Sequence, residues 1–217
     1  MAGSRAPHRP QGRWPLGPGG ALTTAPRNGW WCNVKPELPY PRLPSSAPFS
    51  WKVRWALWRI IEPTLFKVSF HTWSGWRIFL LRLFGARIGS GCVIRRTVRV
   101  YYPWQLEIGD LVIVGDNVRL YSVSKITLES RCMVSQDAYL CASTNDVTDP
   151  LLRLKSAPIL VRSDAWVCAR AFVGPGVTIG EGAVVGACTV VAEDLADGCV
   201  AEGDPPLVRR IPNGDPP

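Results

Sequence analysis

The chain is poor in histidine and has no long apolar run. Histidine occurs only at positions 8 and 71 of the 217 residues, which leaves no cluster of histidines for a metal site and little scope for histidine-based catalysis. Apolar runs extend over only a few residues, such as 78–81, whereas a helix that crosses a membrane needs about 20. No continuous apolar stretch follows the first arginines, so no secretory signal is predicted.

The cysteines do not follow the patterns of extracellular or zinc-binding proteins. There are seven, an odd number, and no Cys-x-x-Cys occurs. This argues against a disulfide framework and a zinc ribbon, and it favours a reducing compartment. We therefore expect a cytoplasmic protein that holds no metal ion.

Acidic residues are nearly absent from the first half. Residues 1–99 hold 16 lysines and arginines against two acids, a net charge of +14, whereas residues 100–217 hold 9 against 15, a net charge of −6. A basic half that also carries eight of the ten tryptophans favours an anionic partner, either a nucleic acid or the inner face of a membrane. The plainer interpretation is a solvated tail and arginines whose stems pack on helices. No nucleic-acid-binding module is recognisable, so we expect no nucleic acid partner, while a peripheral membrane contact stays open.

The chain before the second half divides into two segments. Residues 1–50 contain ten of the twenty prolines and show no helical or strand period, so this segment is predicted to be disordered. Residues 51–85 are predicted to form a helical cap with helices over 51–62 and 75–84. Pro63 marks the predicted end of the first helix, whose stripe is Trp51, Trp55 and Trp58.

The second predicted helix has a clear apolar stripe. Ser74 can cap its start and Gly85 can take the left-handed turn after its end. Arg77 and Arg82 lie off the stripe, which consists of Trp76, Phe79, Leu80, Leu83 and Phe84. We expect both helices to pack on the following domain and to cover its first strands.

From residue 86 the apolar period becomes six residues. An aliphatic residue recurs at every sixth position, a glycine often follows it, and the fourth position after it is usually small. The aliphatic positions are Ile88, Ile94 and Val100; Ile108, Val114, Leu120 and Ile126; Leu128, Val134 and Leu140; and Val161, Val167, Val173, Ile179, Val185 and Val191. The glycines are Gly89, Gly109, Gly115, Gly174, Gly180 and Gly186.

A period of six predicts a solenoid of very short strands. Each unit supplies one strand and one tight corner, with the aliphatic residue pointing inward and the glycine easing the backbone at the corner. Three units of six make one coil, which stacks on the next coil. The predicted fold class is therefore all-β, a left-handed parallel β-helix over residues 86–205, with a tail over residues 206–217.

Three segments carry a resemblance to a known family. They are GWRIFLLRLFGARIG (75–89), YLCASTNDVTDP (139–150) and VGPGVTIGEGAVVGA (173–187). Over roughly residues 70–210 the chain resembles the hexapeptide-repeat acyltransferases, in the branch of colanic-acid-biosynthesis-type O-acetyltransferases. The resemblance implies transfer of an acetyl group from acetyl-CoA to a sugar hydroxyl of a surface polysaccharide or of its lipid-linked precursor. It also implies a homotrimer with CoA in the cleft between subunits, and no metal.

The repeat is interrupted between Leu140 and Val161, where the related enzymes hold a loop with Ser-His-Asp. The residues aligned with it here are Thr144, Asn145 and Asp146, so the histidine that takes the acceptor proton is replaced by Asn145. The resemblance implies catalytic positions at Asn145, Asp146 and Trp166. Asp146 and Asp149 are alternative candidates for a substitute base. Cys141 is either an acyl acceptor or a small packed residue.

The resemblance also implies a donor site. Ala169 and Ala187 match backbone contacts to the CoA arm, Ala192 and Glu193 match a small residue followed by lysine, and Arg210 matches an arginine near the CoA phosphates. Glu193 departs from the family pattern because it replaces a cation. Two such departures leave two functions open: a weakened O-acetyltransferase, and a catalytically silent trimer that binds acyl-CoA or glycan or acts as a scaffold.

Overall fold

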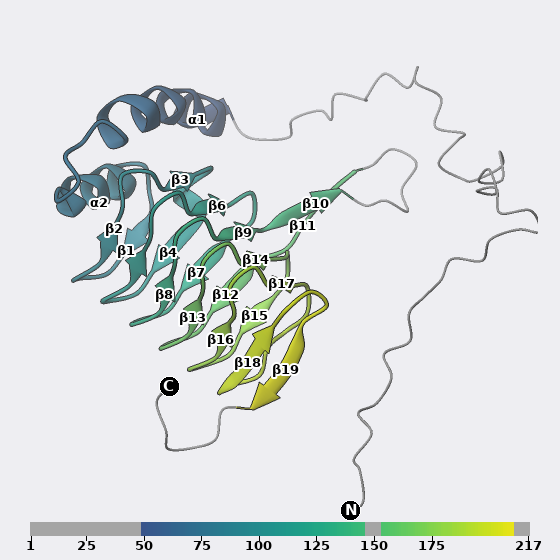
Figure 1. Ribbon diagram of the computed structural model, residues 1–217. Coiled ribbons are helices and arrows are strands. Elements are labelled where there is room, and N and C mark those ends of the chain that lie inside the picture. Colours follow the sequence, from purple (N-terminus) through teal and green to yellow (C-terminus); the bar gives the residue numbers. More distant parts are fainter. Residues whose placement is uncertain (1–48, 146–152, 211–217) are drawn as a thin grey trace, which may run out of the picture. The chain divides into compact units, whose positions relative to one another are not determined.

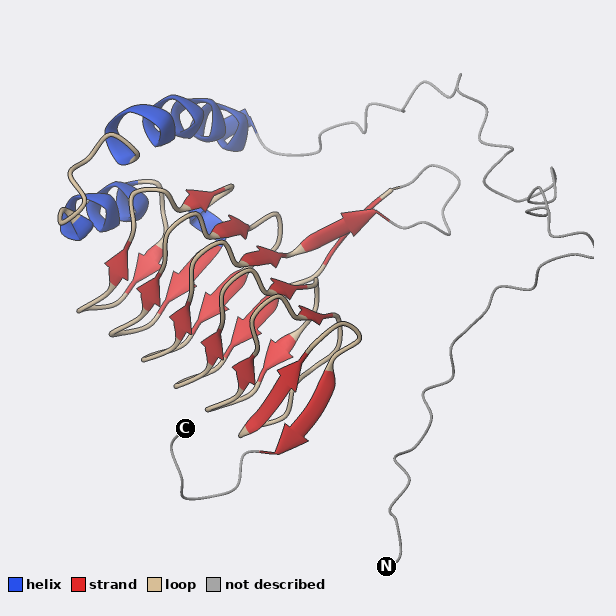
Figure 2. Ribbon diagram, viewed as in Figure 1, coloured by secondary structure: helices blue, strands red, loops and turns tan. Residues whose placement is uncertain are grey.

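The computed structural model describes residues 49–145 and 153–210, which lie within one compact unit, Ser45–Pro217. Short parallel strands are stacked along three faces of a solenoid, and helices lie at its N-terminal end (Figure 1, Figure 2). The expected left-handed parallel β-helix with helices before it is confirmed. The segment predicted to be disordered, 1–50, lies almost wholly outside the described residues.

Each face of the solenoid is one sheet, and we name the sheets A, B and C in the order in which the chain visits them. Sheet A consists of β1 (Arg87–Ile88), β4 (Leu106–Ile108), β7 (Ile126–Leu128), β12 (Ile159–Val161) and β15 (Thr178–Ile179). Sheet B consists of β2 (Val93–Ile94), β5 (Ile113–Val114), β8 (Met133–Val134), β13 (Trp166–Val167), β16 (Val184–Val185), β18 (Cys199–Glu202) and β19 (Leu207–Arg210). Sheet C consists of β3 (Arg99–Val100), β6 (Arg119–Tyr121), β9 (Tyr139–Cys141), β14 (Phe172–Val173) and β17 (Val190–Val191). The turns between the sheets form the A–B, B–C and C–A corners.

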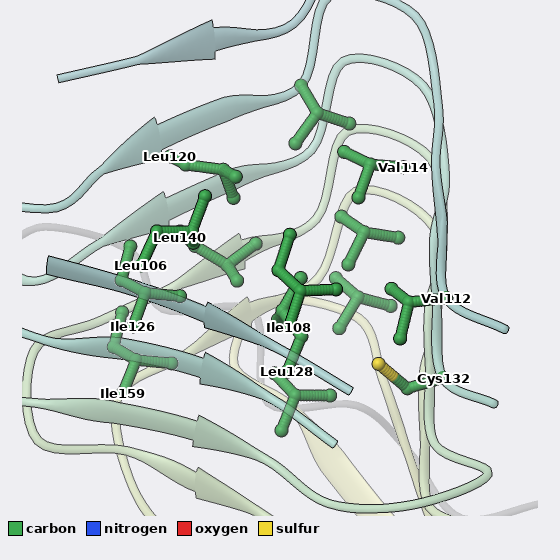
Figure 3. Close-up of a cluster of buried hydrophobic side chains, with 14 of the residues drawn as sticks. Leu106, Ile108, Val112, Val114, Leu120, Ile126, Leu128, Cys132, Leu140 and Ile159 are labelled. Carbon is green, nitrogen blue, oxygen red and sulfur yellow. The ribbon is translucent and has the colours of Figure 1, made fainter. Parts of the chain in front are cut away.

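The aliphatic positions of the six-residue period form the core. All of them are buried. Most of the small residues four places further on are buried too, namely Cys92, Val112, Val118, Ala138, Ala165, Ala171, Val177, Ala183 and Thr189. Figure 3 shows inward side chains from the three sheets meeting in the interior. Because burial of one such side chain stabilises the fold by about 1.5–3 kcal/mol, these columns carry most of the stability.

The first coils are longer than predicted. Ile88 pairs with Ile108, so the first coil exceeds three units of six, whereas Val161 pairs with Ile179 in a coil of three such units. The extra residues lie at the C–A corner, where Leu106 adds a further buried position to sheet A. The prediction that every coil consists of three equal units is therefore wrong, because this corner contributes an apolar residue of its own.

The glycines allow neighbouring coils to approach each other. Left-handed backbone at the corners is adopted largely by other residues, such as Asp164 (φ 60°) and Arg170 (φ 59°). At Gly180, an added Cβ would lie 2.4 Å from the backbone nitrogen of Asp197 in the next coil. The expectation that glycine at this position eases the corner conformation is wrong, since it is required by the lack of room for a side chain.

The first α-helix ends close to the predicted position, and a π-helical turn follows it. Helix α1 (Phe49–Ile61) continues into a π-helical turn, η2 (Glu62–Phe66), in which the Lys67 amide donates to the Glu62 carbonyl at 3.0 Å. Pro63 marks the end of the α-helix as predicted, and it lies in the first turn of η2, where its fixed φ and missing N–H are tolerated. A short 3₁₀ turn, η3 (Pro103–Gln105), lies at the C–A corner of the first coil.

Helix α2 (Ser74–Leu83) buries only part of the face that was predicted. Trp76, Phe79 and Leu83 of the predicted stripe are exposed, whereas Arg77 is fully buried. The Arg77 guanidinium donates to the carbonyl oxygens of Ile94, Phe70 and His71 at 2.7–2.8 Å, and to Ser69 Oγ at 2.9 Å. The predicted stripe is therefore right for Leu80 and Phe84, which are buried, and wrong for the three exposed residues. The buried face includes Arg77 because nearby backbone carbonyls require a donor, and this guanidinium supplies it.

The helices close the open edge of the first coil. Trp58 Nε1 donates to the Val100 carbonyl at 2.7 Å, and the Ile94 amide donates to Ser74 Oγ at 2.8 Å. Ser74 therefore does not cap α2, whereas Gly85 adopts the predicted left-handed turn after it (φ 90°). These bonds satisfy strand groups that have no preceding coil to pair with.

Two features depart from the regular coil. An antiparallel arm of β10 (Ser143–Asn145) and β11 (Leu154–Ser156) leaves the solenoid at the C–A corner of the third coil (Figure 1). Strand β19 pairs antiparallel with β18, so part of the predicted tail is an edge strand of sheet B. None of the helices in the described residues is both long enough and apolar enough to cross a membrane.

Substitution of Gly180 tests the close approach of the coils. We expect Gly180→Ala to lower the free energy of unfolding by about 1–3 kcal/mol, because the new Cβ overlaps backbone that cannot move independently. Gly75→Ala is the control, since its Cβ meets nothing within 4 Å and lies in α2, where alanine is favoured by about 0.5–1 kcal/mol. Chemical denaturation measures both. Equal stability of the two variants would contradict the close-approach role.

Candidate active site

Trp166 lies on the outer face of sheet B. Its strand β13 is paired with β8 and β16, so its neighbours along the sheet are Met133 and Val184. The indole is partly exposed, and its Nε1 donates to Ser135 Oγ at 2.8 Å. This hydrogen bond orients the ring, and part of the indole surface remains exposed.

Ala169 and Ala187 are stacked at the B–C corner. The Cys188 amide donates to the Ala169 carbonyl at 2.9 Å, which joins the two corners directly. In the part of the chain that the structure describes, the amides of Ala169 and Ala187 donate no hydrogen bond. The coils nearer the N-terminus carry larger residues at this corner, for example Arg96 and Gln136. Only the last coils therefore offer free donors beside small side chains.

Asn145 is the last described residue of strand β10 in the arm. It is exposed and lies opposite Leu154, with Thr144 opposite Lys155. Asp146, which the sequence predicts as a substitute base, lies outside the described residues. The arm holds Asn145 beyond the C–A corner, away from the body of the solenoid.

Ala192 and Glu193 lie at the C–A corner, after strand β17. Both are exposed, and they border a cavity of about 310 Å³ that also touches Leu195 and Pro206. Arg210, at the end of β19, is exposed on the edge of sheet B. No cation lines this cavity, and Glu193 adds a negative charge to it. The cavity therefore does not favour a phosphate group.

The predicted site residues fall into two groups within one chain. Trp166, Ala169 and Ala187 lie on sheet B and at its B–C corner, whereas Asn145, Ala192 and Glu193 lie at the C–A corner. In a three-sided solenoid the C–A corner is opposite sheet B. One chain therefore does not bring Asn145 together with Trp166.

Cys141 is packed at the root of the arm. It is 8% exposed, and its thiol contacts the Ser143 carbonyl at 3.0 Å and the Tyr139 hydroxyl at 3.4 Å. A thiol enclosed in this way has no room to attack the carbonyl carbon of an acyl donor, so the packing role is the one that the structure supports. Within residues 49–145 and 153–210, no group of His, Cys, Asp and Glu is arranged to hold a metal ion.

Sequence reasoning missed a row of arginines and tyrosines on sheet C. Arg99 pairs with Arg119, which pairs with Tyr139 on the next strand. Tyr101 and Tyr121 stand side by side with ring centroids 4.8 Å apart. Successive members of the row are separated in the sequence by the length of one of the first coils. Until that length is known, the sequence does not show that these residues are neighbours.

Comparisons with known proteins agree with this architecture. The family model for bacterial transferase hexapeptide (six repeats) matches residues 158–193. The chain is 42% identical over 154 residues to a protein of Escherichia coli K12 named as the colanic acid biosynthesis acetyltransferase WcaF, covering 71% of this chain and 85% of that one.

Two solved structures share the fold. The hexapeptide-repeat acetyltransferase VCA0836 of Vibrio cholerae, complexed with acetyl coenzyme A, superposes with a TM-score of 0.69 at 18% identity, covering 76% of this chain and 90% of that one. A galactoside acetyltransferase in complex with coenzyme A also gives a TM-score of 0.69, at 21% identity, covering 76% of this chain and 84% of that one.

The β-helix and the interrupting arm define the class of hexapeptide-repeat acyltransferases. Within that class, the chain belongs to the hexapeptide-repeat acetyltransferase family, in the branch that contains WcaF.

Proposed function

We propose that the chain is an acetyl-CoA-dependent O-acetyltransferase that acts on a sugar hydroxyl in the biosynthesis of a surface polysaccharide. The observation that carries this proposal is the pair of free amides at Ala169 and Ala187, beside the partly exposed indole of Trp166. The name of the WcaF relative supports a polysaccharide acceptor. Transfer of an acyl group from a thioester to a sugar hydroxyl requires a cleft that excludes water. The indole of Trp166 and the B–C corner would form two sides of such a cleft.

The residues proposed to bind acetyl-CoA suit its arm but not its phosphate groups. Amide donors beside methyl side chains allow the flexible, polar arm of CoA to lie against the backbone. Glu193 opposes the phosphates of the same molecule by like charge, while Arg210 offers a compensating cation. The donor therefore binds chiefly through its arm and thioester.

The reaction requires a group that accepts the hydroxyl proton of the acceptor. The acceptor oxygen attacks the thioester carbonyl carbon, a C–O bond forms, the C–S bond breaks, and CoA leaves as the thiol once the hydroxyl proton has reached it. Asn145 can orient the hydroxyl by hydrogen bonding, but a carboxamide does not take up a proton near neutral pH. Loss of a general base costs about 10²–10⁴-fold in rate. Asp146 remains the proposed substitute base.

A complete site requires more than one copy of the chain. Asn145 and Trp166 belong to opposite sides of the solenoid, so they meet only if the arm of one copy reaches sheet B of another. A closed ring of three identical chains would place three such contacts in equivalent positions. We therefore propose a homotrimer with the site between neighbouring subunits.

The second candidate function is a catalytically silent trimer that binds acyl-CoA or glycan, or acts as a scaffold. The replacement of the family histidine by Asn145, together with Glu193 on the donor side, favours it. The free amides and the retained tryptophan favour the enzyme. Both candidates have the same fold, and they differ in whether the protein turns over acetyl-CoA.

Asn145→His tests whether only the base is missing. We expect this change to raise kcat/KM by about 10²-fold, because an imidazole can accept the hydroxyl proton. Thiol release from acetyl-CoA with a panel of sugars measures it. Thr144→His is the matched control, since neighbouring residues of a strand point to opposite faces and its imidazole would be directed away.

Two results would contradict these assignments. If the natural protein already turns over at ordinary enzymatic rates and Asn145→Ala leaves the rate unchanged, the base lies elsewhere. If neither the natural protein nor Asn145→His binds acetyl-CoA in calorimetry, the donor half is closed and the silent trimer is the correct function.

The helical segment 49–84 also favours contact with a membrane where a lipid-linked acceptor would be found. Its exposed apolar residues follow helical spacing on α1 and α2: Phe49, Val53, Leu57 and Ile60 on α1, and Trp76, Phe79 and Leu83 on α2. The same segment holds several exposed cations and one acid, Glu62. Exposed apolar residues flanked by cations suit the surface of an anionic membrane.

Vesicle binding tests this contact. We expect the full chain to sediment with phosphatidylglycerol-containing vesicles at low salt and less so with pure phosphatidylcholine. The double change Leu57→Ser and Phe79→Ser should reduce binding severalfold, whereas Leu207→Ser, a still more exposed apolar position on β19, should not. Absence of binding to anionic vesicles would leave these helices with a packing role alone.

A further inference from the structure

A basic pocket lies between the helical segment and sheet C. Its volume is about 430 Å³, within the range of sites for small molecules. The end of α1 and η2 contribute one wall, and strands β3, β6 and β9 contribute the floor. The charged and aromatic residues that line it are Arg59, Glu62, Lys67, Arg96, Arg99, Tyr101, Arg119, Tyr121 and Tyr139.

The pocket holds five cations and one carboxyl group. Within the described ranges, none of the five cations forms an ion pair, although strand and corner arginines elsewhere do so, for example Arg87 with Glu107 and Arg131 with Asp164. The carboxyl group belongs to Glu62; burial raises its pKa from the ordinary value, while the charges of Arg59, Arg99 and Lys67 lower it. Five cations against one carboxyl group leave the pocket with an excess of positive charge, which would attract an anion.

Two of the cations are placed against each other. Arg99 and Arg119 are direct partners in neighbouring strands of sheet C. Like charges that face each other across strands destabilise a sheet. Glu62 is the one carboxyl group among the residues that line the pocket, and it interacts with Arg99 without forming an ion pair, so positive charge remains in excess. The Arg119 guanidinium also lies 6.0 Å from the ring centroid of Tyr139, which holds it over the pocket floor. An anion bound between the two guanidinium groups would remove the repulsion.

The tyrosines add a surface for a ring. The rings of Tyr101 and Tyr121 are 4.8 Å apart, and those of Tyr121 and Tyr139 are 6.4 Å apart, so they form a continuous aromatic strip. Burial raises the pKa of Tyr121 and Tyr139, so their hydroxyls remain protonated near neutral pH and can donate hydrogen bonds. Aromatic faces with hydroxyl ends suit a sugar, which has apolar C–H faces and many acceptor oxygens.

The pocket adjoins the root of the arm. The Tyr139 hydroxyl contacts the Cys141 thiol, and the arm begins at Ser143. A sugar on the tyrosines would therefore lie on the same side of the solenoid as Asn145.

We propose that this pocket binds the acceptor and that the acceptor is a phosphorylated saccharide, with its phosphate held by Arg99 and Arg119 and its sugar ring on the tyrosine strip. This inference rests on the proposed function, because it names the substrate class of the same reaction. Guanidinium groups bind phosphate oxygens through paired hydrogen bonds, which a neutral sugar cannot offer. The phosphate can belong to a soluble glycosyl phosphate or to a lipid-linked one, since both present the same chemistry.

Calorimetry on the full chain tests the pocket with matched probes, glucose 1-phosphate and glucose. We expect the phosphorylated sugar to bind at least tenfold more tightly, with an affinity that falls as salt rises. Arg99→Gln and Arg119→Gln should each weaken glucose 1-phosphate about tenfold or more and leave glucose unchanged. Arg131→Gln, a surface arginine paired with Asp164 and outside the pocket, is the control and should change neither. Thermal melting and light scattering establish that each variant is folded and keeps its oligomeric state.

The lipid-linked source is tested in the same variants. Phosphatidylcholine vesicles with and without a polyisoprenyl phosphate replace the soluble probe. Binding that requires this lipid and is lost in Arg99→Gln supports a lipid-linked acceptor, and binding of the soluble probe alone supports a soluble one.

Several outcomes would overturn the inference. They are equal affinity for the two soluble probes without any response to the lipid, binding that Arg99→Gln and Arg119→Gln leave unchanged, and competition of glucose 1-phosphate with CoA for the same site. Acetyl-CoA binding is measured in the same samples. If acetyl-CoA binds and neither phosphorylated probe does, the inference fails and the proposed function stands. If a phosphorylated probe binds and acetyl-CoA does not, the proposed function fails and the phosphate site stands.

Discussion

The stacking of one coil directly on the next is the constraint on which the rest of the molecule depends. Each inward aliphatic residue must meet its counterpart in the neighbouring coil, and backbone contacts as close as that between Gly180 and Asp197 leave no freedom in the register. Once the register is fixed, every position of the sequence is assigned to a sheet or a corner. The arm is thereby fixed at the C–A corner and Trp166 on the outer face of sheet B.

The same constraint creates two demands that polar residues meet. The first coil has no preceding coil to pair with, so its backbone groups are satisfied by the helices, through Trp58, Ser74 and the buried Arg77. Outward positions on sheet C are brought into columns whether or not their charges agree, which sets Arg99 against Arg119. Side chains of the helices satisfy the backbone groups of the first coil. For the repulsion between Arg99 and Arg119 we propose that a bound phosphate relieves it.

The sequence predicted the fold well because its signal is periodic. A buried residue at every sixth position needs no knowledge of distant contacts, and the interruption after Leu140 marked the arm correctly. The buried face of α2 was predicted only in part, since an apolar stripe does not reveal that carbonyls elsewhere need the Arg77 guanidinium. The pocket on sheet C escaped prediction for a similar reason: Arg99 and Arg119 become neighbours only through the greater length of the first coils. The division of the site between two sides of the solenoid likewise appears only in three dimensions.

Covalent cross-linking between the arm and sheet B tests most directly that the site forms between two copies. Asn145→Cys is combined with Met133→Cys, beside Trp166, in a Cys188→Ser background that removes an exposed native thiol, and a short bis-maleimide is added. We predict covalent species of two and three chains of 23.9 kDa each on a denaturing gel, which variants with only one of the two introduced cysteines do not give. A cross-link confined to single chains, or none at all, would contradict a site shared between neighbouring subunits.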